Sequence, residues 1–227
     1  FPDSGSLGFH TNGHFDKVVN IEKCWLQPDP SNALRNYIYN YAIAKNLEFF
    51  DIRNQKGFLR TLMIRTSSLN EVMVVLSVFR DDREELQELL SSVKNNFPSV
   101  TSLMYVINPK GNDTINDLDI NLFYGRDYIL EKMEGLQFRI GPKSFFQTNT
   151  AQAYNLYKVV REFAGLTGDE IVYDLYTGTG TIAQFIAGNA KKVAGIDCIP
   201  SAIDDAVKNA SYNGIDNVHF FTGDIKE

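Results

Sequence analysis

The chain has 227 residues, of which 44% are hydrophobic and 22% charged, and its formal net charge is −6. This composition is typical of a globular protein, the length allows one large domain or two small ones, and the acidic balance argues against a general polyanion binder. Cys24 and Cys198 show no paired spacing, so neither a disulfide framework nor a zinc site is indicated. No apolar run approaches the ~20 residues of a membrane span, and we expect a soluble, cytoplasmic protein.

The first part of the chain predicts a connecting segment and a small α+β domain. Residues 1–30 are rich in glycine, histidine and proline and contain one short strand, "DKVVNI". A helix is expected from Ser31 to about Asn46, then strands at "LEFFDI", "FLRTLMIRT" and "EVMVVLSVF", and an amphipathic helix after "DDREE". Strands at "VTSLMYVI", "NLFYG", "YILEKM" and "LQFRI" complete a central domain at residues 31–140.

From residue 141 strands alternate with helices. A helix after "SFFQTN", with Asn149 as its cap, is expected to end at Gly165 or Gly168. Strand "EIVYDL", a glycine loop, a helix, strand "KVAGID", helix "SAIDDAVKNASYNG" and strand "VHFFT" follow. This alternation is typical of βαβ units with parallel strands. The fold class is therefore α/β, with residues 141–227 forming an incomplete Rossmann-like sheet.

A basic run lies in the central domain. Arg53, Lys56, Arg60 and Arg65 occur without an acidic residue between them, and Phe58 lies among them. Such a run is a small nucleic-acid footprint or a solvated strand edge kept basic to prevent pairing, and the sequence leaves both interpretations open.

The glycine loop indicates a nucleotide-like cofactor. Gly178 and Gly180 fall where the first parallel strand turns into its helix, which is where ligands bind in open parallel sheets. Asp197 ends the next strand, and a carboxylate there can accept hydrogen bonds from both hydroxyls of a ribose. Dinucleotides and S-adenosylmethionine both fit this pattern.

Two further carboxylates favour S-adenosylmethionine. Asp174 would repel a diphosphate but could accept from the ammonium of a methionine, and Asp224 follows the third strand, beside the expected adenine. A nicotinamide or flavin site, and a purely structural turn, stay open as alternatives. Asp174 and Asp197 could also act only as caps of the loop and of the following helix, and Asp224 could be a solvated loop residue.

At this point the sequence resembles the S-adenosylmethionine-dependent RNA (uracil-5-)-methyltransferases, which make 5-methyluridine in ribosomal and transfer RNA. The resemblance covers nearly the whole chain. It is carried by "IGPKSFFQTNTAQAYNLY" and "YDLYTGTGTIA", by "LGFHTNGHFDKVVNIEKC" near the N-terminus, and by "NDTIND" and "YGRDYILEKMEGLQFRIGP", which match the RNA-contacting central domain.

The resemblance implies contacts to the cofactor by particular residues. Gln147 would lie near its methionine end, Tyr176 and Thr181 would line the loop, Asp197 would bind the ribose, and Asp224 would lie by the adenine. The sequence departs from the family at Tyr176 and Thr177, where phenylalanine and cysteine are frequent.

The two cysteines receive different interpretations. Cys24 matches the last of four ligands to an iron–sulfur cluster in many members, but the chain lacks the other three, so a cluster is expected only in a longer chain. Cys198 is expected to be a small buried apolar residue. The chain is expected to be a fragment, because it opens at Phe1 and stops at Glu227, just after the third strand.

The resemblance also implies a mechanism. A cysteine thiolate adds to carbon 6 of uracil, carbon 5 takes the methyl group, and a base then removes the carbon 5 proton. In the family both groups lie beyond the third strand, so no catalytic residue is assigned in this chain. We expect the intact protein to methylate uridine in RNA, most of all 23S rRNA, and this chain to be inactive.

Rival functions and an assembly question stay open. The rivals are a methyltransferase acting on another base or on protein, and a non-catalytic RNA-binding module with a methyltransferase fold. RNA is expected to bind the central domain, and replacing Arg60 and Arg65 by alanine is expected to weaken this binding. The first parallel strand should have an unpaired edge that a neighbour covers, while the oligomeric state is undetermined by the sequence.

Overall fold

The computed structural model describes residues 5–224, which divide into two compact units. Within the described residues, the first unit comprises residues 5–66 and 71–127, and the second comprises residues 67–70 and 128–224. The predicted mixed α/β fold class is confirmed. The division falls at residues 127 and 128, whereas the sequence placed the domain boundary at residue 140.

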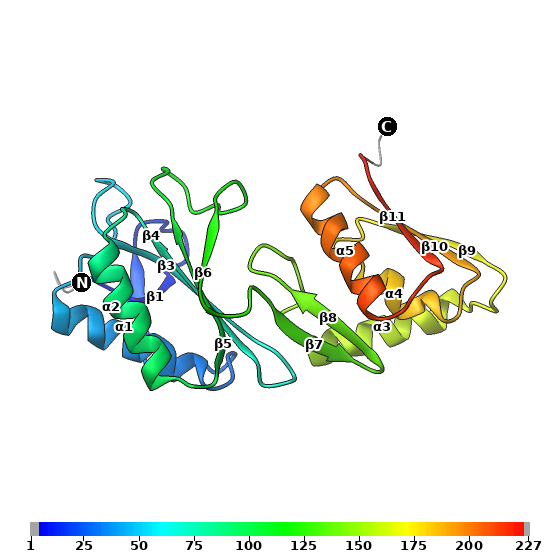
Figure 1. Cartoon of the computed structure of the whole chain (residues 1–227), viewed down its shortest axis with the longest axis horizontal. Helices are drawn as coiled ribbons and strands as arrows, with labels where there is room; N and C mark the ends of the chain where they lie inside the picture. The colour runs from blue at the N-terminus through cyan, green and yellow to red at the C-terminus, as the bar shows by residue number, and fades with distance from the viewer. Residues whose placement is uncertain (1–4, 225–227) are drawn as a thin grey trace. The chain divides into compact units, whose positions relative to one another are not determined.

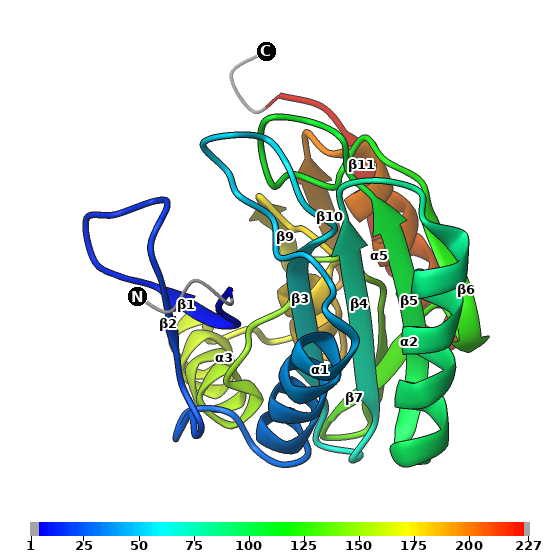
Figure 2. The same ribbon diagram turned by 90° about the vertical axis from the view of Figure 1, so that its left-hand side faces the viewer.

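The first unit is a mixed sheet with two helices on one face (Figure 2). Its sheet has the order β3-β4-β5-β6, in which β4 and β5 are parallel and the other neighbours are antiparallel. A separate antiparallel ribbon, β1 with β2, precedes the sheet in the chain. The elements are β1 (Gly8–His10), β2 (Val18–Asn20), α1 (Ser31–Lys45), β3 (Leu59–Thr66), β4 (Val72–Val78), α2 (Arg83–Asn96), β5 (Val100–Ile107) and β6 (Ile120–Gly125).

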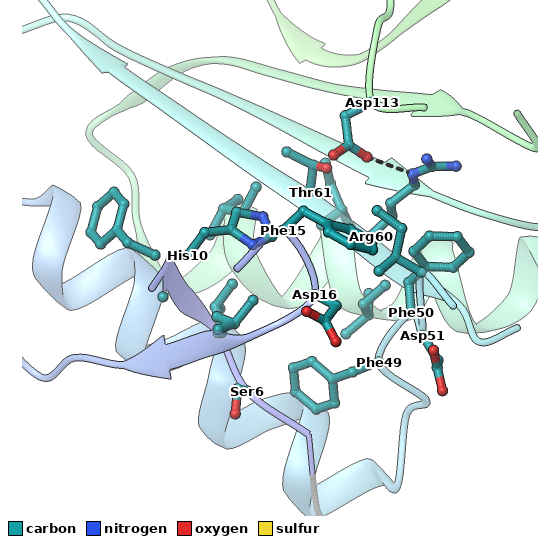
Figure 3. A pocket seen from close by; sticks show the side chains of 18 of the residues that line it. Ser6, His10, Phe15, Asp16, Phe49, Phe50, Asp51, Arg60, Thr61 and Asp113 are labelled. Carbon is teal, nitrogen blue, oxygen red and sulfur yellow. Dashed lines mark hydrogen bonds and ion pairs between the residues drawn. The ribbon is translucent and has the colours of Figure 1, made fainter. Parts of the chain in front are cut away.

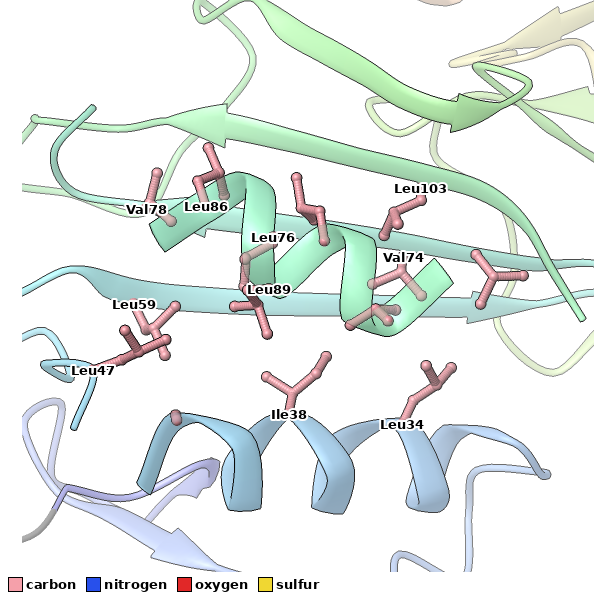
Figure 4. Close-up of a cluster of buried hydrophobic side chains, with 14 of the residues drawn as sticks. Leu34, Ile38, Leu47, Leu59, Val74, Leu76, Val78, Leu86, Leu89 and Leu103 are labelled. Carbon is pink, nitrogen blue, oxygen red and sulfur yellow. The ribbon is translucent and has the colours of Figure 1, made fainter. Parts of the chain in front are cut away.

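The core of this unit lies between the sheet and both helices. Strand β4 is buried at every residue, and its alternate residues Val72, Val74, Leu76 and Val78 face the helices. Figure 4 shows Leu34 and Ile38 of α1 and Leu89 of α2 pointing to these strands. The spacing of the apolar residues in α2, which predicted an amphipathic helix, is thereby explained.

One predicted strand of the first unit is absent. The segment "LEFFDI" pairs only through isolated bridges, Phe49 with Leu59 and Asp51 with Lys56. The carboxylate of Asp51 accepts from the backbone N–H groups of Arg53 and Asn54, so the chain turns there instead of extending. Aromatic and β-branched composition alone did not reveal this turn.

The second unit contains the βαβ units (Figure 1). Its elements are β7 (Ile129–Met133), β8 (Leu136–Ile140), α3 (Thr150–Ala164), β9 (Ile171–Leu175), α4 (Thr181–Ala187), β10 (Lys192–Asp197), α5 (Pro200–Tyr212) and β11 (Val218–Thr222). Strands β7 and β8 form an antiparallel hairpin, and the other three strands form a parallel sheet of order β11-β10-β9.

The hairpin belongs to this unit because of its packing. Met133 and Phe138 of the hairpin are buried in one cluster with Tyr157 of α3 and Phe185 of α4. The buried carboxylate of Glu131 accepts hydrogen bonds from Ser68, through its backbone N–H and its hydroxyl, and from the hydroxyl of Thr150. These bonds join three segments distant in sequence, and they explain why residues 67–70 and 128–140 lie in the second unit.

Candidate functional site

The candidate site lies at the carboxyl edge of the parallel sheet in the second unit. Leu175 is in register with Ile196, and Asp197 with Thr222, so the three strands end at the same edge. The backbone N–H of Gly223 donates to the carbonyl of Asp197 over 3.0 Å, which joins the ends of β10 and β11. Asp174, Asp197 and the exposed Asp224 therefore belong to one edge, as the sequence pattern predicted.

The loop after β9 depends on backbone conformations that favour glycine. Gly178 and Gly180 have φ of +55° and +73°, and Tyr176 has φ of +62° with its ring exposed. A Cβ on Gly180 would lie 2.5 Å from the ring of Phe220 in β11. A Cβ on Gly178 would meet nothing within 4 Å. Gly180 thus lets the helix pack closely on the sheet, while the space beside Gly178 is open to a ligand.

Asp174 holds the glycine loop. Its Oδ2 accepts from the hydroxyl of Thr177 over 2.7 Å and from the backbone N–H of Ala183, in the first turn of α4, over 3.0 Å. Burial raises the pKa of this carboxyl, the two hydrogen bonds oppose the rise, and the charge of Asp197 adds to it. The loop-capping role, which the sequence left open for Asp174, is therefore observed.

Asp197 also binds backbone groups. Its Oδ2 accepts from the N–H of Gly178 over 2.9 Å, and its Oδ1 accepts from the N–H of Ile199 over 2.9 Å, before α5 begins. Each carboxylate oxygen can accept a second hydrogen bond. Asp197 therefore orients the loop and retains acceptor capacity for hydroxyl groups of a ligand.

The segment before α3 lies against the loop. The hydroxyl of Thr179 reaches the carbonyl of Phe145 over 3.4 Å and lies 3.2 Å from the hydroxyl of Thr181, the buried first residue of α4. Gln147, two residues after Phe145, is exposed. The ring of Phe145 is also exposed. The sequence analysis did not single out Phe145, whose neighbour Phe146 packs against the core.

One of the two cysteines, Cys198, is not where the sequence predicted it. Cys198 is exposed, directly after Asp197, and was wrongly expected to be buried. The chain turns from strand to helix there, so its side chain does not enter the sheet packing. Cys24 is partly exposed, and Asn32 accepts from its backbone N–H over 2.7 Å. Among residues 5–224, no cluster of three or more His, Cys, Asp or Glu side chains could hold a metal ion.

The basic run of the first unit is partly enclosed. The side chain of Arg60 is 1% exposed, and Phe58 is buried in the core. Burial lowers the pKa of the Arg65 guanidinium, and Arg53 forms an ion pair with Asp16. The expected contribution of Arg60 and Phe58 to an RNA surface over residues 53–65 is therefore corrected, because both side chains are enclosed. RNA binding by the central domain as a whole stays a prediction. None of the helices in the described part of the chain combines the length and apolar character that a membrane crossing needs.

Comparisons with known proteins agree with this geometry. Residues 166–227 match a family model described as a methyltransferase domain. The chain is 54% identical over 230 residues to an uncharacterized RNA methyltransferase of Bacteroides thetaiotaomicron, covering all of this chain and 51% of the relative. It is 56% identical over 223 residues to one of Porphyromonas gingivalis, covering 97% and 48%. The chain thus spans about half the length of the curated relatives it matches.

A solved structure is similar over most of the chain. The tRNA (uracil-54, C5)-methyltransferase of Pyrococcus abyssi, in complex with S-adenosyl-L-homocysteine, superposes with a TM-score of 0.78 and 27% identity. The match covers 93% of this chain and 51% of that structure. The resemblance to RNA methyltransferases found from the sequence motifs is confirmed, and the fold is that of S-adenosylmethionine-dependent methyltransferases.

Proposed function

We propose that the protein containing this chain methylates carbon 5 of uridine in RNA, with S-adenosylmethionine as the methyl donor. The similarity to the Pyrococcus abyssi uracil-C5 enzyme over 93% of the chain carries the proposal. The shared edge of Asp174, Asp197 and Asp224 beside an open glycine loop supports it independently, because this edge suits a ligand with an ammonium, a ribose and an adenine amine.

Each residue of the site has a role in the proposal. Asp197 would accept from the ribose hydroxyls with its remaining acceptor capacity, and Asp224 would lie by the adenine. Gln147 would approach the methionine end, where Asp174 would offer its Oδ1 to the ammonium. The cofactor would lie along the loop, next to the exposed ring of Tyr176, the buried Thr181 and the open space beside Gly178.

The cofactor supplies a methyl group on a sulfonium, and uracil must be activated to accept it. In the proposed reaction, a thiolate adds to carbon 6, the electron pair displaced to carbon 5 forms the new bond to the methyl group, and a base removes the carbon 5 proton as the thiolate leaves. Neither Cys24 nor Cys198 is assigned this role. Cys24 lies in the other unit and matches a cluster ligand in the family, and its other ligands would have to come from elsewhere in the protein.

The experiment measures tritium release from RNA labelled at carbon 5 of uridine, using the full-length protein and S-adenosylmethionine. We expect release, with 5-methyluridine found by nucleoside mass spectrometry in ribosomal RNA, 23S rRNA first, or in tRNA. The 227-residue chain alone should release no tritium above background. A methylated base other than uridine, or no methylated nucleoside at all, would overturn the proposal.

A second experiment tests the cofactor site separately from catalysis. The substitution Asp197→Asn should weaken S-adenosylmethionine binding to the full-length protein by about 10- to 150-fold, since hydrogen bonds to a charged acceptor are worth about 1.5–3 kcal/mol. The matched control is Asp216→Asn, an exposed aspartate of the same unit outside the strand edge. Calorimetry that finds equal affinities for both variants would remove Asp197 from the site.

A further inference from the structure

The first unit contains a cavity separate from the glycine-loop site. It has a volume of about 670 Å³ and lies between the β1–β2 ribbon, the turn at residues 49–53 and the edge strand β3. This volume is within the range of small-ligand pockets, which is about 300–1,000 Å³. Figure 3 shows side chains from all three segments around the hollow, among them His10, Phe15, Phe49, Phe50, Arg60 and Thr61.

Aromatic rings form much of the cavity wall. Phe15 is 66% exposed and Phe9 is 48% exposed, although both line the cavity. Phe49 and Phe50 come from the turn that replaces the predicted strand. The ribbon that carries Phe9 has only three residues in each strand. Exposed aromatic rings around a hollow indicate a surface that binds a flat ligand.

Arg60 supports the same wall from behind. Its guanidinium lies 4.4 Å from the centre of the Phe50 ring, and its Nε donates to Asp113 over 2.9 Å. Nη1 donates to the carbonyls of Asn108 and Lys110, over 2.8 and 2.5 Å. Nη2 is buried and has no hydrogen-bond partner among the described residues. Because the side chain of Arg60 is only 1% exposed, its role in the wall is to support the Phe50 ring and the segment at residues 108–113, and a ligand does not reach its guanidinium.

The charges of the cavity disfavour a phosphate as its occupant. Asp16, Asp51 and Asp113 line it together with Arg53 and Arg60, so carboxylates outnumber guanidinium groups. Asp16 is paired with Arg53, which holds the pKa of that carboxyl below its usual value and keeps it charged. A neutral ring with hydrogen-bonding edges suits such a lining, whereas a phosphate would be repelled.

We propose that this cavity holds one unstacked nucleobase from a single-stranded segment of the RNA substrate. Unpaired bases stack on aromatic side chains and bind through their polar edges. The cavity offers the exposed ring of Phe15 for stacking, and the exposed side chains of His10 and Thr61 for polar contacts. Arg53, with its side chain 65% exposed at the rim, would lie toward the backbone of the RNA. This inference rests on the proposed function, because it takes RNA as the substrate.

The test replaces an exposed ring of the cavity in the full-length protein. Phe15→Ala should weaken binding of a single-stranded RNA substrate by about 5- to 150-fold, the effect of losing one base stack, and Phe15→Tyr should restore most of the affinity. The salt dependence of binding and the affinity for S-adenosylmethionine should not change, because no phosphate contact and no cofactor contact is removed. Tyr124→Ala is the control, an exposed aromatic of the same unit that does not line the cavity.

Photocrosslinking locates the base directly. RNA containing 4-thiouridine should crosslink to the segment that carries Phe9 and Phe15, and the crosslink should disappear in Phe15→Ala. If the unsubstituted protein binds and methylates RNA while Phe15→Ala matches Tyr124→Ala and no crosslink forms there, this inference is overturned and the proposed function stands. A large drop in the melting temperature of Phe15→Ala, with RNA affinity unchanged, would also overturn it, because the Phe15 ring would then serve the folding of the unit and not the binding of a base. Absence of any RNA binding by the unsubstituted protein would overturn both.

Discussion

Arg60 fixes a loop of the first unit to strand β3. Its guanidinium bonds to the carbonyls of Asn108 and Lys110 and to Asp113, on the segment that follows β5. The sequence shows the charge of Arg60 but not its partners, which lie about fifty residues further along the chain. A basic residue that predicted nucleic-acid binding is therefore explained by the folding of its own unit.

Replacing Arg60 should affect stability rather than phosphate binding. Arg60→Ala should lower the free energy of unfolding by about 1–3 kcal/mol, because buried carbonyl groups lose their donors. Urea unfolding measures this loss, and salt titration of RNA binding should give the slope of the unsubstituted protein. The exposed Lys56 of the same run is the control, and Lys56→Ala should change stability by less than about 0.5 kcal/mol. A flatter salt slope in Arg60→Ala would restore the phosphate-contact interpretation.

Gly180 is required by both conformation and space. Its φ is +73°, and a Cβ there would lie 2.5 Å from the Phe220 ring and 3.0 Å from the Cβ of Ala206. Gly180→Ala should destabilise the protein by about 1–3 kcal/mol, the usual cost of a strained backbone position. Thermal and urea unfolding of the 227-residue chain provide the measurement.

Gly188 is the matched control for this substitution. It closes α4 with φ of −64°, and a Cβ there would meet nothing within 4 Å. Gly188→Ala should leave stability unchanged or raise it by up to about 1 kcal/mol, because alanine restricts the unfolded chain. Equal losses in the two variants would show that neither the conformation nor the Phe220 contact distinguishes Gly180.

At the scale of elements, local patterns predicted most of the second unit. Asn149 caps α3 by accepting from the N–H of Gln152, and Gly165 ends that helix with φ of 55°, as the sequence indicated. The alternation of strands and helices predicted the parallel pairing of β9, β10 and β11. These signals succeed because caps, spacing and turn residues act within a few positions of each other.

Features that depend on distant partners were not predictable. The assignment of the β7–β8 hairpin rests on Glu131 bonding to Ser68, which is 63 residues away. The turn in "LEFFDI" rests on the side chain of Asp51, which overrides the β propensity of its neighbours. At the candidate site, the sequence identified the acidic residues but not that Asp174 and Asp197 both bind the loop backbone.

The turn before β9 gives the second unit a pH dependence. The carboxylate of Glu170 accepts from the hydroxyl and the N–H of Thr167 and from the N–H of Gly168, and these bonds lower its pKa to about 2, from 4.5. A lowered pKa means that the folded state favours the charged form, so this stabilisation is complete above about pH 5 and is lost as the pH falls toward 2.

The substitution Glu170→Gln should remove this part of the acid response. The melting temperature of the variant should fall less steeply between about pH 5 and pH 2 than that of the unsubstituted chain, while at neutral pH the variant should be the less stable of the two. Circular dichroism melts across this pH range provide the data. Glu162→Gln, at an exposed position of α3, is the control and should follow the unsubstituted chain. Parallel curves for Glu170→Gln and the unsubstituted chain would contradict the assignment.

At the scale of the whole molecule, each unit has its own hydrophobic core and its own candidate site. The glycine loop and its carboxylates lie within the second unit, and the aromatic cavity lies within the first. Substitutions at one site therefore need not disturb the packing of the other. This separation allows the proposed cofactor binding and the proposed RNA binding to be measured independently of each other.

In the described residues, the parallel sheet leaves one face open and has two unpaired edge strands, β9 and β11. Strand β9 pairs only with β10, and its residues Ile171, Tyr173 and Leu175 are all exposed, as is Phe221 of β11. Right-handed crossovers place both α4 and α5 on one face of the sheet. The four exposed side chains lie on the other face, which neither helix covers. The predicted unpaired edge of β9 is confirmed for residues 5–224.

An apolar strand with free backbone groups pairs readily with another chain. The 227-residue chain alone should therefore self-associate, and its mean mass by light scattering should rise with concentration. Tyr173→Lys should shift it toward the monomer, because a charge on the open strand opposes pairing, whereas Leu122→Lys, at an exposed position on β6 of the first unit, should not. A concentration-independent monomer before any substitution would mean that exposure of this strand is not enough to drive association, and the edge would then need no covering partner.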